Sequence, residues 1–127
     1  NPGQKIIYFA LDLNNRKKNI RNLVFNIEKS IIEFLKIYEI NAKADRKNIG
    51  IWVNKKKIAA IGIKVTKWIA YHGCSINVNN DLSKYKKIIP CGLNNSEVTS
   101  IYYEKKTNIK NINQNLKKVF SSNLKNI

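Results

Sequence analysis

One cysteine stands in a setting that could support chemistry. Cys91 lies between Pro90 and Gly92 in the stretch KKIIPCGLNN, where two isoleucines precede a turn. Proline fixes the direction of the chain and glycine permits a tight turn, so the sulfur can be exposed at the end of a strand. Backbone N–H groups at such a turn can favour the thiolate, which is the nucleophilic form of cysteine. Cys91 is therefore a candidate nucleophile, and an inert loop cysteine is the alternative.

A lysine could serve as a proton carrier. Lys57 opens the strand-like stretch KIAAIGIKV, and strict alternation of side chains predicts it on the same face as Ala59 and Ile61. A lysine at the edge of an apolar face loses hydration and becomes able to exchange protons near neutral pH. The plainer interpretation is a solvated lysine in the basic turn KKK, and the pattern alone favours it. The small residues that follow allow a ligand, or a helix, to lie close to the backbone.

The next strand-like stretch, YHGCSINV, contains a histidine and the second cysteine. Alternation places His72 and Cys74 on one face with Ile76. A lone histidine on such a face is more often a hydrogen-bonded core residue than a catalyst. A mid-strand cysteine among apolar neighbours behaves as a small hydrophobic residue, and burial raises the pKa of its thiol. Cys74 is therefore predicted to be an unreactive core residue.

Length and composition limit the possible classes of protein. A chain of 127 residues predicts one domain with a modest core. No apolar run approaches the roughly 18 residues of a membrane span, and the first residues lack the pattern of a signal peptide. Two cysteines without such a signal indicate a reducing compartment, the cytoplasm. We expect no zinc site, because two cysteines and one histidine do not supply four clustered ligands.

The formal net charge of +16 invites a nucleic-acid interpretation. Lysine outnumbers arginine by 21 to 3, however, and arginine is the better reader of bases and phosphates. The lysines are also spread from Lys5 to Lys125, among the many asparagines and isoleucines that an AT-rich genome favours. We therefore predict no nucleic-acid partner. A basic surface instead attracts acidic proteins and speeds their encounter.

Hydrophobic periodicity predicts an α/β domain. Apolar side chains recur at spacings of three and four from Arg16 to about Tyr38, which is typical of an amphipathic helix. A second helix is expected from near Thr107 to Leu124. Strand-like stretches occupy residues 4–13, 49–53, 57–65 and 68–78.

Several motifs, taken in order, resemble the lipoyl(octanoyl) transferase family: PGQ, GIWV, KIAAIGIKVTKWIAYHGCSINVNNDL, IIPCGL and VTS. The resemblance runs from Pro2 to about Ser100. It implies the fold of the biotin and lipoate protein ligase superfamily, a mixed sheet covered by helices. The family has an Arg-Gly-Gly…His-Gly stretch before PGQ that has no counterpart here. Residues 1–127 are therefore expected to form a single catalytic domain that is incomplete at its N-terminal end.

The resemblance also implies roles for particular residues. Cys91, in the Pro-Cys-Gly motif, matches the nucleophile of the family, which forms an acyl thioester. Lys57 matches the lysine that tunes this cysteine and acts as acid and base. Two stretches match substrate-contacting segments: Ala60, Ile61 and Gly62, and Gly73, Cys74 and Ser75. The family usually has a large apolar residue at the position of Cys74, which supports its assignment to the core.

The activity implied is the transfer of an octanoyl group from octanoyl-acyl carrier protein, through a cysteine thioester, to a lysine of a lipoyl domain. The acceptors would be the lipoyl domains of 2-oxoacid dehydrogenases and the glycine cleavage H protein, in the bacterial cytoplasm. No cofactor, metal or membrane is implied, and the sequence has no glycine-rich phosphate-binding motif that ATP would need. The alternatives are an ATP-using lipoate ligase, which keeps the lysine but does not need the cysteine, and a basic binding module without catalysis.

Overall fold

The computed structural model describes residues 3–8, 10–15, 20–79, 98–105 and 109–125. The candidate nucleophile Cys91 lies outside these residues, so the structure does not test its placement.

The described strands form one six-stranded sheet. Its order is β1 (Gln4–Tyr8), β6 (Ile69–Asn77), β5 (Lys56–Thr66), β4 (Ile51–Val53) and β3 (Lys43–Ala44), and β2 (Leu11–Asp12) also pairs with β6. These pairings are antiparallel, and one isolated parallel bridge between Lys57 and Val98 makes the sheet mixed. The expected α/β class with a mixed sheet is confirmed.

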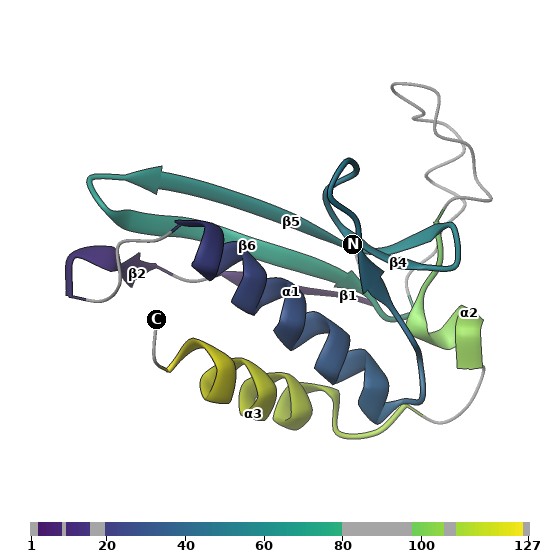
Figure 1. Cartoon of the computed structure of the whole chain (residues 1–127). Coiled ribbons are helices and arrows are strands. Elements are labelled where there is room, and N and C mark those ends of the chain that lie inside the picture. Colours follow the sequence, from purple (N-terminus) through teal and green to yellow (C-terminus); the bar gives the residue numbers. More distant parts are fainter. Residues whose placement is uncertain (1–2, 9, 16–19, 80–97, 106–108, 126–127) are drawn as a thin grey trace.

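Two helices cover one face of this sheet. The long helix α1 (Ile20–Ile37) lies beside α3 (Ile112–Leu124), and in Figure 1 both run beneath the strands. The apolar spacing of α1 explains its position, because its buried side chains form one stripe that closes the core against the sheet. The buried residues of α1 are Leu23, Ile27, Ser30, Ile31, Phe34 and Leu35. The other face of the central strands carries no helix among the described elements, and this open face contains the candidate site.

The short elements differ from the sequence prediction. The stretch predicted as one strand over residues 4–13 contains β1 and β2 and ends in a 3₁₀ turn, η1 (Leu13–Asn15). Helix α3 begins at Ile112 because Asn111 has a left-handed backbone, with φ of 60°, which a helix interior does not accept. Strand β3 and helix α2 (Ile101–Lys105) were not predicted, since elements of two and five residues are too short to show a period.

None of the described helices combines the length and the apolar character needed to cross a lipid bilayer.

Candidate functional site

Strands β5 and β6 bring the two predicted substrate-contacting stretches together. Ala60 pairs with Ser75, Ile61 with Cys74, and Gly62 with Gly73. Residues that face each other across a ladder share one side of the sheet, so each pair belongs to one face. Ala60, Gly62 and Ser75 lie on the open face, whereas the side chain of Cys74 is buried in the core.

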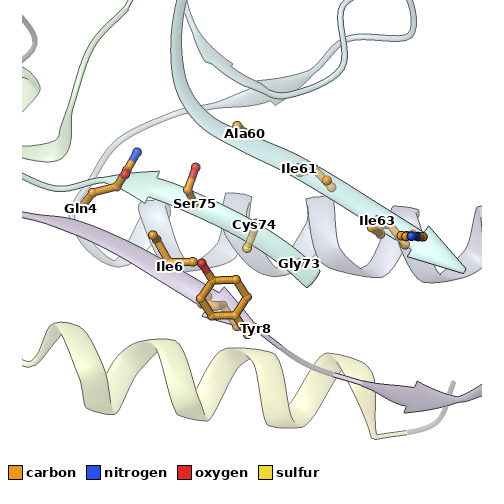
Figure 2. Close-up of a pocket in the computed structure, with 12 residues that line it drawn as sticks. Gln4, Ile6, Tyr8, Ala60, Ile61, Ile63, Gly73, Cys74 and Ser75 are labelled. Atoms are coloured by element: carbon orange, nitrogen blue, oxygen red, sulfur yellow. The ribbon is translucent and has the colours of Figure 1, made fainter. Parts of the chain in front are cut away.

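The open face holds a trough of about 550 Å³ above these strands, and all six predicted residues line it. Its floor is made of small residues, and β1 adds Ile6 and Tyr8, which are 45% and 72% exposed (Figure 2). A Cβ atom built on Gly62 would meet no atom of the described residues within 4 Å, so the space directly above this glycine is open to them. Small residues beneath exposed apolar ones can accommodate an extended apolar chain close to the backbone.

Cys74 belongs to the core. Figure 2 shows its sulfur and the Ser75 hydroxyl leaving β6 on opposite sides. Cys74 is 4% exposed, and burial raises the pKa of its thiol to about 12. The prediction that Cys74 belongs to the core is confirmed, and its low reactivity stays a prediction. A ligand in the trough would meet the backbone of this residue and not its sulfur.

Lys57 lies on the opposite face from the one that alternation predicts. Ala59 pairs with Ile51 and Lys57 pairs with Trp52, so Ile58 is an extra residue in β5. This bulge turns both Ile58 and Ala59 into the core, where they are buried. The predicted grouping of Lys57 with Ala59 is therefore wrong, because strict alternation cannot anticipate a bulge. Lys57 shares its face with Trp52, on the side of the sheet that carries the trough.

A glycine provides the space for this lysine. A Cβ atom built on Gly50 would lie 2.5 Å from Lys57 Cε, and Gly50 has a φ of +140°, which side chains rarely allow. The Lys57 ammonium lies 5.9 Å from the centre of the Trp52 ring, within cation–π range. The Trp52 indole N–H donates to the carbonyl of Asn48 at 3.0 Å, which fixes the orientation of the ring. Gly50 and Trp52 have no role predicted from the sequence, although both belong to the GIWV motif.

A match to a family of known proteins covers most of the chain. The family model described as the lipoyl protein ligase A/B catalytic domain matches residues 1–121. The chain belongs to this family. The resemblance seen in the sequence motifs is thereby confirmed.

Curated relatives of this lipoyl protein ligase A/B domain are named octanoyltransferase. The protein from Rickettsia rickettsii is 46% identical over 107 residues, which is 79% of this chain and 51% of the relative. That from Orientia tsutsugamushi is 47% identical over 106 residues, with the same coverage of 79% and 51%. That from Bartonella tribocorum is 43% identical over 112 residues, covering 78% and 46%. The chain thus spans about half the length of the curated relatives it matches.

Several solved structures share this fold. A biotin protein ligase from Aquifex aeolicus superposes with a TM-score of 0.75 at 24% identity, over 97% of this chain and 53% of that one. The bipartite lipoate protein ligase from Thermoplasma acidophilum superposes with a TM-score of 0.78 at 13% identity, over 98% of this chain and 52% of that one. A lipoate-protein ligase A bound with ATP superposes with a TM-score of 0.75 at 14% identity, over 96% of this chain and 51% of that one. At these identities the likeness concerns the fold.

In this lipoyl protein ligase A/B domain, a buried asparagine connects the strands around Lys57. The Gln4 side-chain amide donates to Asn77 Oδ1 at 3.0 Å, and the Asn77 amide donates to the carbonyl of Thr99 at 3.1 Å. The backbone N–H of Thr99 then donates to the carbonyl of Lys57 at 2.9 Å. Asn77 is 6% exposed, so these bonds satisfy polar groups that water hardly reaches. Asn77 has no role assigned from the sequence, although it lies within the quoted motif that ends in NVNNDL.

The described part of the chain contains no group of three or more histidine, cysteine, aspartate or glutamate side chains that could hold a metal ion.

Proposed function

We propose that this domain carries catalytic residues of an octanoyltransferase, which moves an octanoyl group from octanoyl-acyl carrier protein to a lysine of a lipoyl domain. The acceptors would be the lipoyl domains of 2-oxoacid dehydrogenases and the glycine cleavage H protein, in the bacterial cytoplasm. The family and the names of the relatives support this class of reaction. The observation that carries the proposal is that Lys57 lies on the face of the sheet that holds the trough.

The trough suits the octanoyl chain. Ala60, Gly62 and Ser75 leave room for a chain of methylenes, and Ile6 and Tyr8 offer apolar contacts at one side. Each methylene removed completely from water contributes about 0.8 kcal/mol, so several methylenes supply useful binding energy even in an open site.

The proposed reaction has two steps. First, the Cys91 thiolate attacks the carbonyl carbon of the donor thioester, a new C–S bond forms, and the C–S bond to the carrier breaks. The departing carrier thiolate takes a proton from the Lys57 ammonium. Second, the neutral amine of the acceptor lysine attacks the enzyme thioester, an amide bond forms, and the bond to Cys91 breaks. Neutral Lys57 accepts the proton that the amine loses, which restores the starting state.

The chain path supports the pairing of these two residues. Val98 forms the parallel bridge to Lys57 and follows Cys91 by seven positions in the sequence. A positively charged lysine close to the cysteine would favour its thiolate. Exchange of one thioester for another is nearly neutral in free energy, and amide formation runs downhill, so this route needs no ATP.

Intact-protein mass spectrometry tests the proposal. Mixed with octanoyl-acyl carrier protein, the protein should gain the mass of one octanoyl group, and a free lipoyl domain added next should remove it. The Cys91→Ser variant should gain nothing, whereas the matched Cys74→Ser variant should still gain the group. Transfer from free octanoate that depends on ATP would identify a lipoate ligase instead. Absence of any adduct under both conditions would leave a binding module.

A further inference from the structure

Three strands place two lysines and a tryptophan in one row on the open face. Lys43 of β3 pairs with Trp52 of β4, and Trp52 pairs with Lys57 of β5. Partners across a ladder share a face, so Lys43 and Lys57 flank Trp52, and the Lys57 ammonium lies 5.9 Å from the centre of its ring. We call these three residues the basic row. It lies on the same face of the sheet as the trough but on strands nearer the β3 edge.

A groove of about 450 Å³ adjoins the basic row. Its polar lining consists of Lys43, Lys55, Trp52, Asn48, Asn54 and one acidic residue, Asp45, whose carboxylate accepts hydrogen bonds from neighbouring N–H groups. The groove therefore offers two ammonium groups and hydrogen-bonding amides within one hollow. Such a lining suits a ligand whose anionic group is flanked by other hydrogen-bonding groups.

The charge of this region is concentrated and unpaired. Residues 43–57 contain six basic side chains and one acidic side chain, Asp45. The Asp45 carboxylate accepts hydrogen bonds from the backbone N–H of Lys47 at 3.0 Å and from the Asn48 amide at 3.3 Å. No ion pair joins Lys43, Lys55 or Lys57 to a carboxylate within the described ranges. The positive potential here is free to act on a ligand.

We propose that the groove beside the basic row binds, through Lys43 and Lys55, the phosphate group of the flexible arm on which the donor carries its acyl thioester. This inference rests on the proposed function and names a subsite for its substrate. The trough would hold the apolar end of the donor, Lys57 would lie at the thioester, and Lys43 and Lys55 would hold the phosphate on the same face. An acyl group on a phosphopantetheine arm presents both chemistries in one molecule. Lysines bind phosphate as point charges, and the neighbouring amides match the amides of the arm.

Fluorescence of Trp52 can report this binding. Trp68 is the other tryptophan, so a Trp68→Phe background leaves Trp52 as the only indole. Titration with 4′-phosphopantetheine should change the emission of Trp52, whereas pantetheine, which lacks the phosphate, should change it much less. Lys43→Gln and Lys55→Gln should each weaken binding of 4′-phosphopantetheine by about threefold to tenfold, as the loss of one charged partner predicts. Both lysines are exposed, so these variants should fold.

The control is Lys118→Gln on α3, which removes one exposed lysine on the helix-covered side. Equal weakening by this variant would show that only net charge matters and would overturn the subsite. Equal responses to pantetheine and 4′-phosphopantetheine would overturn it as well, and so would tighter binding of ATP than of 4′-phosphopantetheine. Competition by acyl carrier protein without its arm, as strong as with it, would point to a protein-docking surface and also overturn it.

The phosphate subsite and the proposed octanoyl transfer can be refuted by different results. A thioester on Cys91 without phosphate selectivity would overturn the subsite and leave the transferase intact. Phosphate-selective binding that is lost in Lys43→Gln, with no octanoyl adduct, would support the subsite and overturn the acyl transfer.

Discussion

At the scale of single residues, the two cysteines have different settings. Cys74 is buried, and burial raises the pKa of its thiol to about 12, whereas Cys91 stands in a Pro-Cys-Gly turn sequence. We expect alkylation at neutral pH to label Cys91 well before Cys74, because the thiolate is the reactive form. Limited labelling followed by peptide mapping measures both rates in one sample. Faster labelling of Cys74 would contradict the assignment of Cys91 as nucleophile.

The buried thiol also makes stability depend on alkaline pH. In the unfolded chain the Cys74 thiol has its ordinary pKa of 9.0, and in the folded chain about 12. The folded state therefore holds a proton that the unfolded state loses, so this contribution is complete below about pH 9. It is then lost as pH rises toward 12, by up to about 1.4 kcal/mol per pH unit.

Urea unfolding between pH 7 and about pH 10.5 tests this linkage. The parent protein should lose more stability above pH 9 than the Cys74→Ala variant, whose cavity cost does not depend on pH. Parallel curves for the two proteins would contradict the raised pKa of the thiol.

Gly50 is predicted to be essential for the position of Lys57. An alanine there would place its Cβ atom against Lys57 Cε and adopt an unfavourable φ, so Gly50→Ala should lower the free energy of unfolding by about 1–3 kcal/mol. It should also slow octanoyl transfer, because the lysine must move.

Gly62→Ala is the matched comparison for stability. Its added Cβ meets nothing within 4 Å, and its unfolding free energy should stay within about 0.5 kcal/mol of the parent value. Equal destabilisation by the two substitutions would show that the space near Lys57 is not the cause.

At the scale of elements, Asn77 ties β1, β6 and Thr99 into one unit around Lys57. Asn77→Ala leaves the buried carbonyl of Thr99 without its side-chain donor, so we expect a loss of about 1–3 kcal/mol in unfolding free energy. Asn79 is exposed, so the control Asn79→Ala should change stability by less than about 0.5 kcal/mol. Urea denaturation compares the two variants, and similar values for both would exclude a special role for the buried network.

Elements whose hydrophobic pattern repeats over many residues could be predicted from the sequence. The stripe on α1 and the alternation in β6 are carried by many residues, so single exceptions do not hide them. The bulge at Ile58 and the left-handed Asn111 could not be predicted, because each depends on how one residue meets distant parts of the chain. The pattern of neighbouring residues in the sequence does not encode such tertiary contacts.

In the candidate site, too, some features could be predicted from the sequence and others could not. The motifs that contain Ala60, Gly62 and Ser75 lie on two strands that pair in the structure, so these residues share one face, and their contact with substrate stays a prediction. The face of Lys57 was predicted wrongly because a bulge shifts it. The position of Trp52 between Lys43 and Lys57 could not be predicted, because it depends on the pairing of β4 with β3 and β5.

At the scale of the whole molecule, the trough is open along one side, since Ile6 and Tyr8 are exposed on β1 at the edge of the described sheet. The chain also spans only about half the length of its octanoyltransferase relatives. An acyl thioester held on an open face keeps more freedom than one held between two walls. Positioning of reactants can account for several kcal/mol of a reaction barrier. We therefore propose that an upstream stretch completes the site, as the family resemblance implies.

A chimera tests this proposal. The stretch that precedes the matched region in the Rickettsia rickettsii octanoyltransferase is joined to residue 1 of this chain, and octanoyl transfer is compared with that of residues 1–127 alone at equal concentration. We expect the shorter chain to transfer octanoate at least about tenfold more slowly, which corresponds to about 1.4 kcal/mol of lost positioning. Alkylation of Cys91 should be similar in both, because that reaction needs no bound acyl chain. Equal transfer rates, with both proteins folded, would show that the trough formed by β1, β5 and β6 binds the acyl group without a second wall.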